Sequence, residues 1–157
     1  MPTIDDVKAF LVPQGIEVRE FAEPTPTCET AAAAVGCQPA QIAKSVLLLV
    51  GENPVLVVTC GDTKVKSSKL KKATGLSGKV RLPEAEEVMR HTGYAPGGVC
   101  PFLLSPQLPV LLDESLARFE RVYAAAGNAH SAVPVTLAQL QEITGGRRAE
   151  VCDLISP

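Results

Sequence analysis

The sequence predicts an α+β domain in which helices pack against a mixed, curved β-sheet. Two nearly continuous apolar runs, residues 45–50 and 55–60, flank a Gly-Glu-Asn-Pro turn, as expected for a hairpin of central strands covered on both faces. Hairpin and helix patterns then follow one another without regular alternation, which disfavours a doubly wound sheet. Because no linker or repeat divides the 157 residues, we expect one domain over residues 1–157.

Capping and turn signals place the remaining elements. Thr3 and Thr27 are candidate N-caps of two helices, which Pro13-Gln14-Gly15 and Gly36 end. Residues 16–21 alternate apolar and charged side chains, which indicates a half-buried strand. Thr27 caps the helix expected over residues 28–35. Further helices are expected over residues 67–74, 83–91 (with Pro83 at its first position) and 137–144, and short strands over residues 109–112, 121–125, 132–135 and 150–153.

The composition is that of a globular protein with an aliphatic core, because hydrophobic residues make up 46% of the chain and aromatic residues 4%. No apolar run approaches the roughly 20 residues that span a bilayer. The N-terminus lacks the pattern of a signal peptide, so we expect a cytoplasmic protein without membrane contact. Five widely spaced cysteines and two histidines argue against a disulfide framework and a zinc site.

Three segments combine residues that can bind a ligand. Lys44 enters an apolar strand, where a lysine must be paired, reach the surface, or serve an anionic ligand. Gly97 and Gly98 lie in the loop 92–101, where backbone N–H groups can stabilise an oxyanion, although a tight turn looks the same. The small residues of 125–131 suit the floor of a narrow pocket or an ordinary hairpin turn.

A basic stretch covers residues 64–81. It contains seven of the fifteen Lys and Arg residues and no acidic residue. The net charge of −2 disfavours general nucleic-acid binding, but such a local basic face suits contact with phosphates. A solvated helix face is the alternative.

The order of these segments resembles the YbaK/ProX family, which shares its fold with the editing insertion of bacterial prolyl-tRNA synthetases. The resemblance rests on Lys44 in Gln-Ile-Ala-Lys-Ser at a strand start, on the Thr-Gly-Tyr-x-x-Gly-Gly-Val-x-Pro loop over residues 92–101, and on Ala-Ala-Gly at residues 125–127. It runs in one register from about Thr3 to Asp153.

This resemblance implies a trans-acting deacylase that hydrolyses the ester of a mischarged small amino acid, such as Ala or Cys, on tRNA-Pro. It implies no metal or cofactor and no protein nucleophile, with the 3′ end of aminoacyl-tRNA and a prolyl-tRNA synthetase, but not DNA, as partners. The expected catalytic residues are Lys44, Gly97 and Gly98. The expected substrate-binding residues are Thr27, Ser45, Tyr94, Val99, Cys100, Pro101, Ala125, Gly127 and Asn128, and the expected tRNA-binding residues are Lys64, Lys66, Lys69, Lys71 and Lys72.

Two departures from the family pattern leave details open. Phe102-Leu103 follow Pro101 where some members carry a glycine two residues on, and Ala125 and Ala132 stand where cysteinyl-selective members carry polar residues. The loop shape and the amino acid removed are therefore not fixed by the resemblance.

Two other functions remain as alternatives. A non-catalytic tRNA- or synthetase-binding module of the same fold would not need Lys44. A thioesterase using Cys100 would need a nearby base, for which His91 and His130 are the candidates.

Overall fold

The computed structural model describes residues 2–25 and 27–155. Its helices are α1 (Ile4–Leu11), α2 (Cys28–Val35), α3 (Ser67–Thr74), α4 (Ala85–Thr92) and α5 (Leu137–Thr144), with 3-10 helices η1 (Val12–Gln14), η2 (Pro39–Gln41) and η3 (Glu114–Arg118). Its strands are β1 (Arg19–Glu20), β2 (Ile42–Val50), β3 (Asn53–Cys60), β4 (Thr63–Val65), β5 (Val80–Arg81), β6 (Val110–Asp113), β7 (Val122–Ala124), β8 (Ser131–Val135), β9 (Arg147–Ala149) and β10 (Cys152–Leu154).

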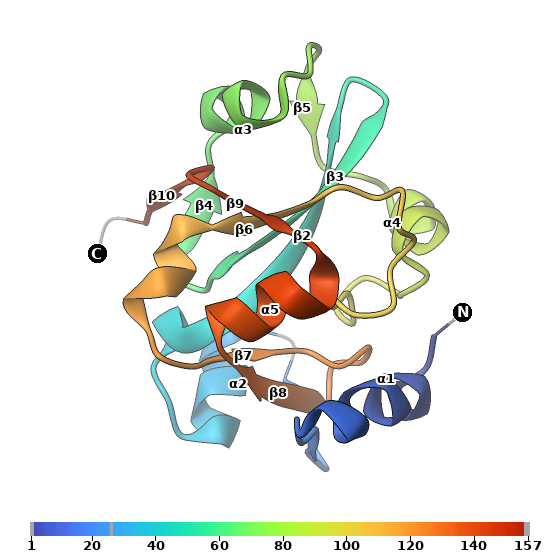
Figure 1. Cartoon of the computed structure of the whole chain (residues 1–157), viewed down its shortest axis with the longest axis vertical. Coiled ribbons are helices and arrows are strands. Elements are labelled where there is room, and N and C mark those ends of the chain that lie inside the picture. The colour runs from blue at the N-terminus through green and yellow to red at the C-terminus, as the bar shows by residue number, and fades with distance from the viewer. Residues whose placement is uncertain (1, 26, 156–157) are drawn as a thin grey trace.

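The main sheet has the strand order β1-β8-β7-β2-β3-β6-β9, and β5 pairs with the far end of β2. The β2–β3 hairpin is antiparallel, whereas β7 joins β2, β6 joins β3 and β9 joins β6 in parallel. A separate two-stranded sheet pairs β4 with β10. Figure 1 shows the long β2–β3 hairpin crossing the centre of the molecule. The predicted mixed α+β architecture is confirmed.

Both faces of the central hairpin are covered, as its apolar runs predicted. On one face, Leu47 and Leu56 belong to a cluster that includes buried residues of α1, α4 and α5. On the other, Leu48 and Val57 belong to a second cluster with Leu70 of α3. Successive residues of a strand point to opposite faces of the sheet. Because each face is covered by its own core, the residues on both faces of these strands are apolar.

The predicted N-caps of the first two helices are confirmed. The Thr3 hydroxyl accepts a hydrogen bond from the N–H of Asp6 at 3.2 Å, and that of Thr27 accepts from the N–H of Thr30 at 3.1 Å. Gly36 ends α2 in the left-handed conformation, with φ of 87°, as the sequence indicated. Among the described residues, no helix is both long and apolar enough to cross a membrane.

Several predicted boundaries are wrong. The strand expected over residues 16–21 is reduced to β1, because Ile16 turns into the core and only two residues pair with β8 at the sheet edge. The fourth helix begins at Ala85 with Glu84 as its N-cap, so Pro83 precedes it. β2 begins at Ile42, three residues earlier than expected.

Candidate active site

A pocket of about 240 Å³ opens where β2, β7 and β8 meet α2 and two loops. The lining is dominated by small side chains, namely Ala31, Ala43, Ala124, Ala125, Ala129 and Ala132. Its volume is smaller than the roughly 300–1,000 Å³ of sites that bind drug-sized ligands. It therefore suits a small group.

The three segments singled out in the sequence converge on this pocket. The predicted residues that line it are Thr27, Lys44, Ser45, Gly97, Val99, Ala125 and Asn128. The predicted residues that do not line it are Tyr94, Gly98, Cys100, Pro101 and Gly127. In the second group, all but the half-buried Gly127 are buried, and Gly98 packs against Gly127.

Lys44 is half-buried in the third position of β2, opposite Thr59 of β3. Its ammonium donates a hydrogen bond to the backbone carbonyl of Thr63. Within residues 2–25 and 27–155, no carboxylate forms an ion pair with it. Lys44 therefore brings an uncompensated positive charge to the pocket, where it can attract an anionic or strongly polar ligand.

A buried polar network fixes the carbonyl that holds Lys44. The hydroxyls of Thr59 and Thr63 lie 2.6 Å apart, and the Thr63 hydroxyl donates to the carbonyl of Cys60 at 2.8 Å. The Asp113 carboxylate accepts from the Thr59 hydroxyl at 3.4 Å and from the N–H of Val151 at 2.9 Å. These contacts lock β4 against β3 and so fix the direction of the lysine.

The two adjacent glycines have different structural roles. Gly97 is exposed, has φ of 89° and would have no atom within 4 Å of an added Cβ. Gly98 is buried, and a Cβ there would lie 2.8 Å from the carbonyl oxygen of Gly127 and 3.1 Å from Cα of Asn128. Gly98 is thus required for the loop to touch the 125–131 turn, a contact that closes one wall of the pocket.

The backbone donors of the loop are also distinct. The N–H of Gly98 donates to the carbonyl of Ala95 at 3.0 Å, so it is not free to bind an oxyanion as the sequence had suggested for this glycine. No hydrogen bond to another described residue engages the N–H groups of Gly97 and Val99, both at the pocket. These two donors remain available to a ligand.

Cys100 is wholly buried behind the loop, and burial raises the pKa of its thiol to about 11. Its sulfur contacts the carbonyl of Phe102, which also accepts a hydrogen bond from the buried Tyr94 hydroxyl. Because a protonated, inaccessible thiol is a poor nucleophile, the thioesterase alternative is disfavoured. Tyr94 and Cys100 support the loop from within the core, and Pro101 is buried beside them.

Leu103 is the one described non-glycine residue with a positive φ, 55°. The loop shape near this position was left open by the sequence. A left-handed backbone at a leucine costs about 1–2 kcal/mol.

The 125–131 turn is held by hydrogen bonds of Ser131 and Thr25, a role that the sequence did not indicate for either residue. The Ser131 hydroxyl accepts from the N–H of Ala126 at 2.9 Å and donates to the carbonyl of Asn128 at 3.3 Å. The Thr25 hydroxyl donates to the carbonyl of Ala129 at 2.9 Å. Thr25 and Ser131 both line the pocket as well as holding its wall.

Other lining residues lacked a distinctive sequence signal. The remaining ones that sequence reasoning missed are Cys28, Ala31, Ile42, Ala43, Tyr123 and Ala124, while Ala129 lies in the predicted 125–131 segment and Ala132 had been noted for its substitution alone. Cys28 follows the cap Thr27, and burial raises the pKa of its thiol despite the nearby Lys44 charge. Among the described residues, no three His, Cys, Asp or Glu side chains group as a metal site requires.

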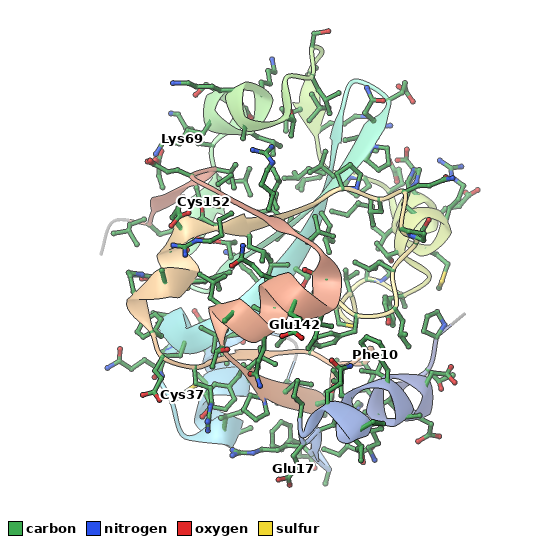
Figure 2. The ribbon with its side chains drawn as sticks, viewed as in Figure 1. Phe10, Glu17, Cys37, Lys69, Glu142 and Cys152 are labelled. Carbon is green, nitrogen blue, oxygen red and sulfur yellow. The ribbon has the colours of Figure 1, made fainter. Side chains whose placement is uncertain are left out.

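The basic stretch is less uniformly charged in the fold than in the sequence. Lys69 contacts Glu150 at 2.8 Å and Asp153 at 2.7 Å, and these carboxylates raise the pKa of its ammonium. Figure 2 shows Lys69 near Cys152 of β10. Arg81 forms a bidentate pair with Glu87 at 3.0 and 2.8 Å. Acidic residues outside the stretch thus pair with two of its seven basic residues, so Lys69, one of the predicted tRNA-binding residues, is engaged in ion pairs within the fold.

The remaining predicted tRNA-binding lysines have no such partner. They are Lys64, Lys66, Lys71 and Lys72, none of which forms an ion pair with another described residue. Lys64, Lys66 and Lys72 are exposed.

Comparison with known proteins places this geometry in a family. Residues 22–143 match the model of the aminoacyl-tRNA editing domain. Protein YwhH of Bacillus subtilis (strain 168), which is uncharacterised, is 37% identical over 129 residues, 82% of this chain and 81% of its own length. A proline–tRNA ligase of Stenotrophomonas maltophilia (strain R551-3) is 32% identical over 117 residues, which are 71% of this chain and 20% of the ligase.

The fold agrees with these sequence matches. A crystal structure described as a candidate trans-editing enzyme for prolyl-tRNA synthetase has a TM-score of 0.86 and 31% identity to this chain, and the match covers 98% of both chains. The resemblance read from the lysine and glycine motifs is therefore confirmed: the chain belongs to the aminoacyl-tRNA editing domain family.

Proposed function

We propose that this protein hydrolyses, in trans, the ester that links a mischarged small amino acid to the terminal adenosine of a tRNA. The proposal rests on one observation: a small, alanine-lined pocket is bordered by the ammonium of Lys44, which is bound by a backbone carbonyl and by no described carboxylate. Membership of the editing family supplies the reaction class. The similarity to a proline–tRNA ligase supports tRNA-Pro as the carrier and a prolyl-tRNA synthetase as a partner.

The site offers two kinds of stabilisation to such a reaction. The Lys44 ammonium holds the polar sugar-phosphate end of the substrate. The N–H groups of Gly97 and Val99, which bond to no other described residue, are the donors that would stabilise the developing oxyanion. Water, or a hydroxyl of the substrate itself, is the attacking group, because an activated ester needs no protein nucleophile.

The pocket selects by volume. Alanine fits a cavity of about 240 Å³ lined by methyl groups, and larger side chains meet its walls. One methylene in such a pocket changes the transition-state free energy by about 1–3 kcal/mol. We therefore expect alanyl-tRNA to be the best substrate, threonyl-tRNA a poorer one and prolyl-tRNA to be spared.

The test is a deacylation panel of alanyl-, cysteinyl-, seryl-, threonyl- and prolyl-tRNA with the wild type and Ala31→Leu. Ala31 lines the pocket from α2, and leucine there keeps the helix and the Thr27 cap. The variant should lose activity on threonyl-tRNA more than on alanyl-tRNA. Ala34→Leu, on the exposed side of the same helix, is the matched control and should retain the wild-type ratio.

Two outcomes contradict the proposal. Absence of hydrolysis of every panel member would favour a non-catalytic tRNA- or synthetase-binding module. An equal ratio of rates in Ala31→Leu and wild type would remove this pocket as the amino-acid site.

A further inference from the structure

A second hollow, of about 290 Å³, lies next to the candidate active site and shares Lys44 with it. The first pocket includes residues 42–45 of β2, and the second continues along the same strand with Val46 and Leu48. In Figure 1, β2 runs from the region of α2 towards β5. The two hollows therefore follow one another along one strand, with Lys44 between them.

The second hollow has an apolar wall that remains open to solvent. Leu48 is 5% exposed and forms part of its floor, whereas Leu82, just after β5, is 72% exposed at its rim. Val46 and Val80 line the space between them and are half-buried. A single exposed leucine is ordinary, but here it extends a continuous apolar wall beside a cavity.

Cationic groups border this wall in two different states. Lys64 is exposed and has no ion-pair partner among the described residues. Arg81 is held at its edge by the bidentate pair with Glu87, so its flat faces are what it offers to a ligand. Nucleobases stack on apolar and guanidinium surfaces, and a nearby lysine binds the attached phosphate.

We propose that the second hollow binds the terminal nucleotide of the tRNA, with the adenine against the wall of Val46, Val80 and Leu82 and the 5′-phosphate at Lys64. This inference rests on the proposed function, because the ester in the first pocket is attached to the ribose of that nucleotide. Lys44, which borders both hollows, then lies at the ribose. One strand thus places the amino acid, the sugar and the base in sequence.

Binding of nucleotide fragments tests the assignment without catalysis. Adenosine 5′-monophosphate, adenosine and inorganic phosphate, each in the millimolar range, are titrated into the ¹⁵N-labelled full chain. Adenosine monophosphate should shift the amide signals of Val46, Val65 and Val80, adenosine should shift the same signals more weakly, and phosphate should affect the surroundings of Lys64. Shifts confined to the first pocket, or none at all, would overturn the assignment.

Two exposed substitutions sharpen the test. Leu82→Asp should weaken adenosine monophosphate binding at least about fivefold, and Lys64→Gln should weaken it while leaving adenosine binding unchanged. Val12→Asp is the matched control, because Val12 is 63% exposed and lies outside both hollows. Equal affinity in Leu82→Asp and Val12→Asp would contradict the proposal.

The same variants separate this inference from the proposed function. With alanyl-tRNA, Leu82→Asp and Lys64→Gln should raise KM and leave kcat close to the wild-type value. If the wild type deacylates alanyl-tRNA and neither KM changes, the nucleotide site is wrong and the function stands. If the wild type binds adenosine monophosphate at the second hollow but hydrolyses no panel substrate, the function is wrong and the binding site stands.

Discussion

Lys44 at the candidate active site and Lys69 in the basic stretch are both half-buried lysines, yet the fold surrounds them differently. Two carboxylates of the C-terminal segment neutralise Lys69. Lys44 is held by a backbone carbonyl, which directs its ammonium without cancelling the charge. The comparison shows that tertiary partners decide which cation is available to a ligand, because neither pairing is visible from neighbouring residues.

The two regions also differ in how their backbone is fixed. Around the pocket, the 92–101 loop touches the 125–131 turn where Gly98 meets the backbone of Gly127, and buried hydrogen bonds fix the shape of each segment. In the basic stretch, β4 pairs with β10 through the backbone, and the Lys69 side chain adds only surface ion pairs, which are weak and screened by salt. Substitutions in the pocket wall should therefore cost more than substitutions of paired surface charges.

The largest effect on stability is expected from Gly98→Ala. Its Cβ would meet the Gly127 carbonyl at 2.8 Å, so the two loops must separate, at a cost of about 1–3 kcal/mol in the free energy of unfolding. Activity should fall as well, because the pocket wall opens. Gly97→Ala is the control: it meets no atom within 4 Å and carries only the strain of its positive φ. Denaturant unfolding that finds the smaller loss in Gly98→Ala would contradict the interlocking of the loops.

A smaller effect, of opposite sign, is expected from Leu103→Gly. Glycine adopts the φ of 55° without the steric penalty of leucine, so the free energy of unfolding should rise by about 0.5–1 kcal/mol. Leu154→Gly, at an exposed leucine of β10 with an ordinary φ, should not stabilise the protein. Thermal unfolding of both variants makes the comparison, and destabilisation by Leu103→Gly would show that the leucine side chain outweighs the strain.

The smallest effect is expected from Lys69→Ala, because its ion pairs are exposed. We expect a slight fall in Tm near neutral pH and wild-type deacylation. Lys69 lowers the pKa of Asp153 from 3.8, so the stabilisation is present above the ordinary carboxylate pKa and is lost as pH falls through the lowered value. The Tm difference between variant and wild type should therefore shrink at acidic pH. A difference that grows on acidification would contradict this pairing.

The helices and the central hairpin were predictable because their signals are local. Helix ends depend on residues only a few positions apart, as the N-caps Thr3 and Thr27 and the C-terminal Gly36 show. The apolar runs of β2 and β3 indicated that both faces of these strands are covered, as the two cores show. By contrast, β9 has the sequence Arg-Arg-Ala and pairs with β6 only through its backbone, so no side-chain pattern indicates it.

The candidate site was predictable where a motif carried it and not where packing created it. The lysine and the Gly-Gly pair located two walls, but the division of roles between Gly97 and Gly98 depends on how closely Gly127 approaches. Thr25 and Ser131 both hold the 125–131 turn through hydrogen bonds. For Thr25 this turn is far away in the sequence, so no local pattern indicates the contact. The partners of Lys69 and Arg81 are likewise set by the fold, which is why the basic stretch seemed more uniform than it is.

The most direct test of the unpaired lysine is single-turnover deacylation of alanyl-tRNA-Pro by Lys44→Ala and Lys69→Ala, with Tm measured for each. Lys44→Ala should keep its Tm close to that of the wild type and lose at least about tenfold in rate. Lys69→Ala should show the reverse, a slightly lower Tm with an unchanged rate. A wild-type rate in Lys44→Ala would contradict the account, since the charge that the fold leaves uncompensated would then have no part in the reaction.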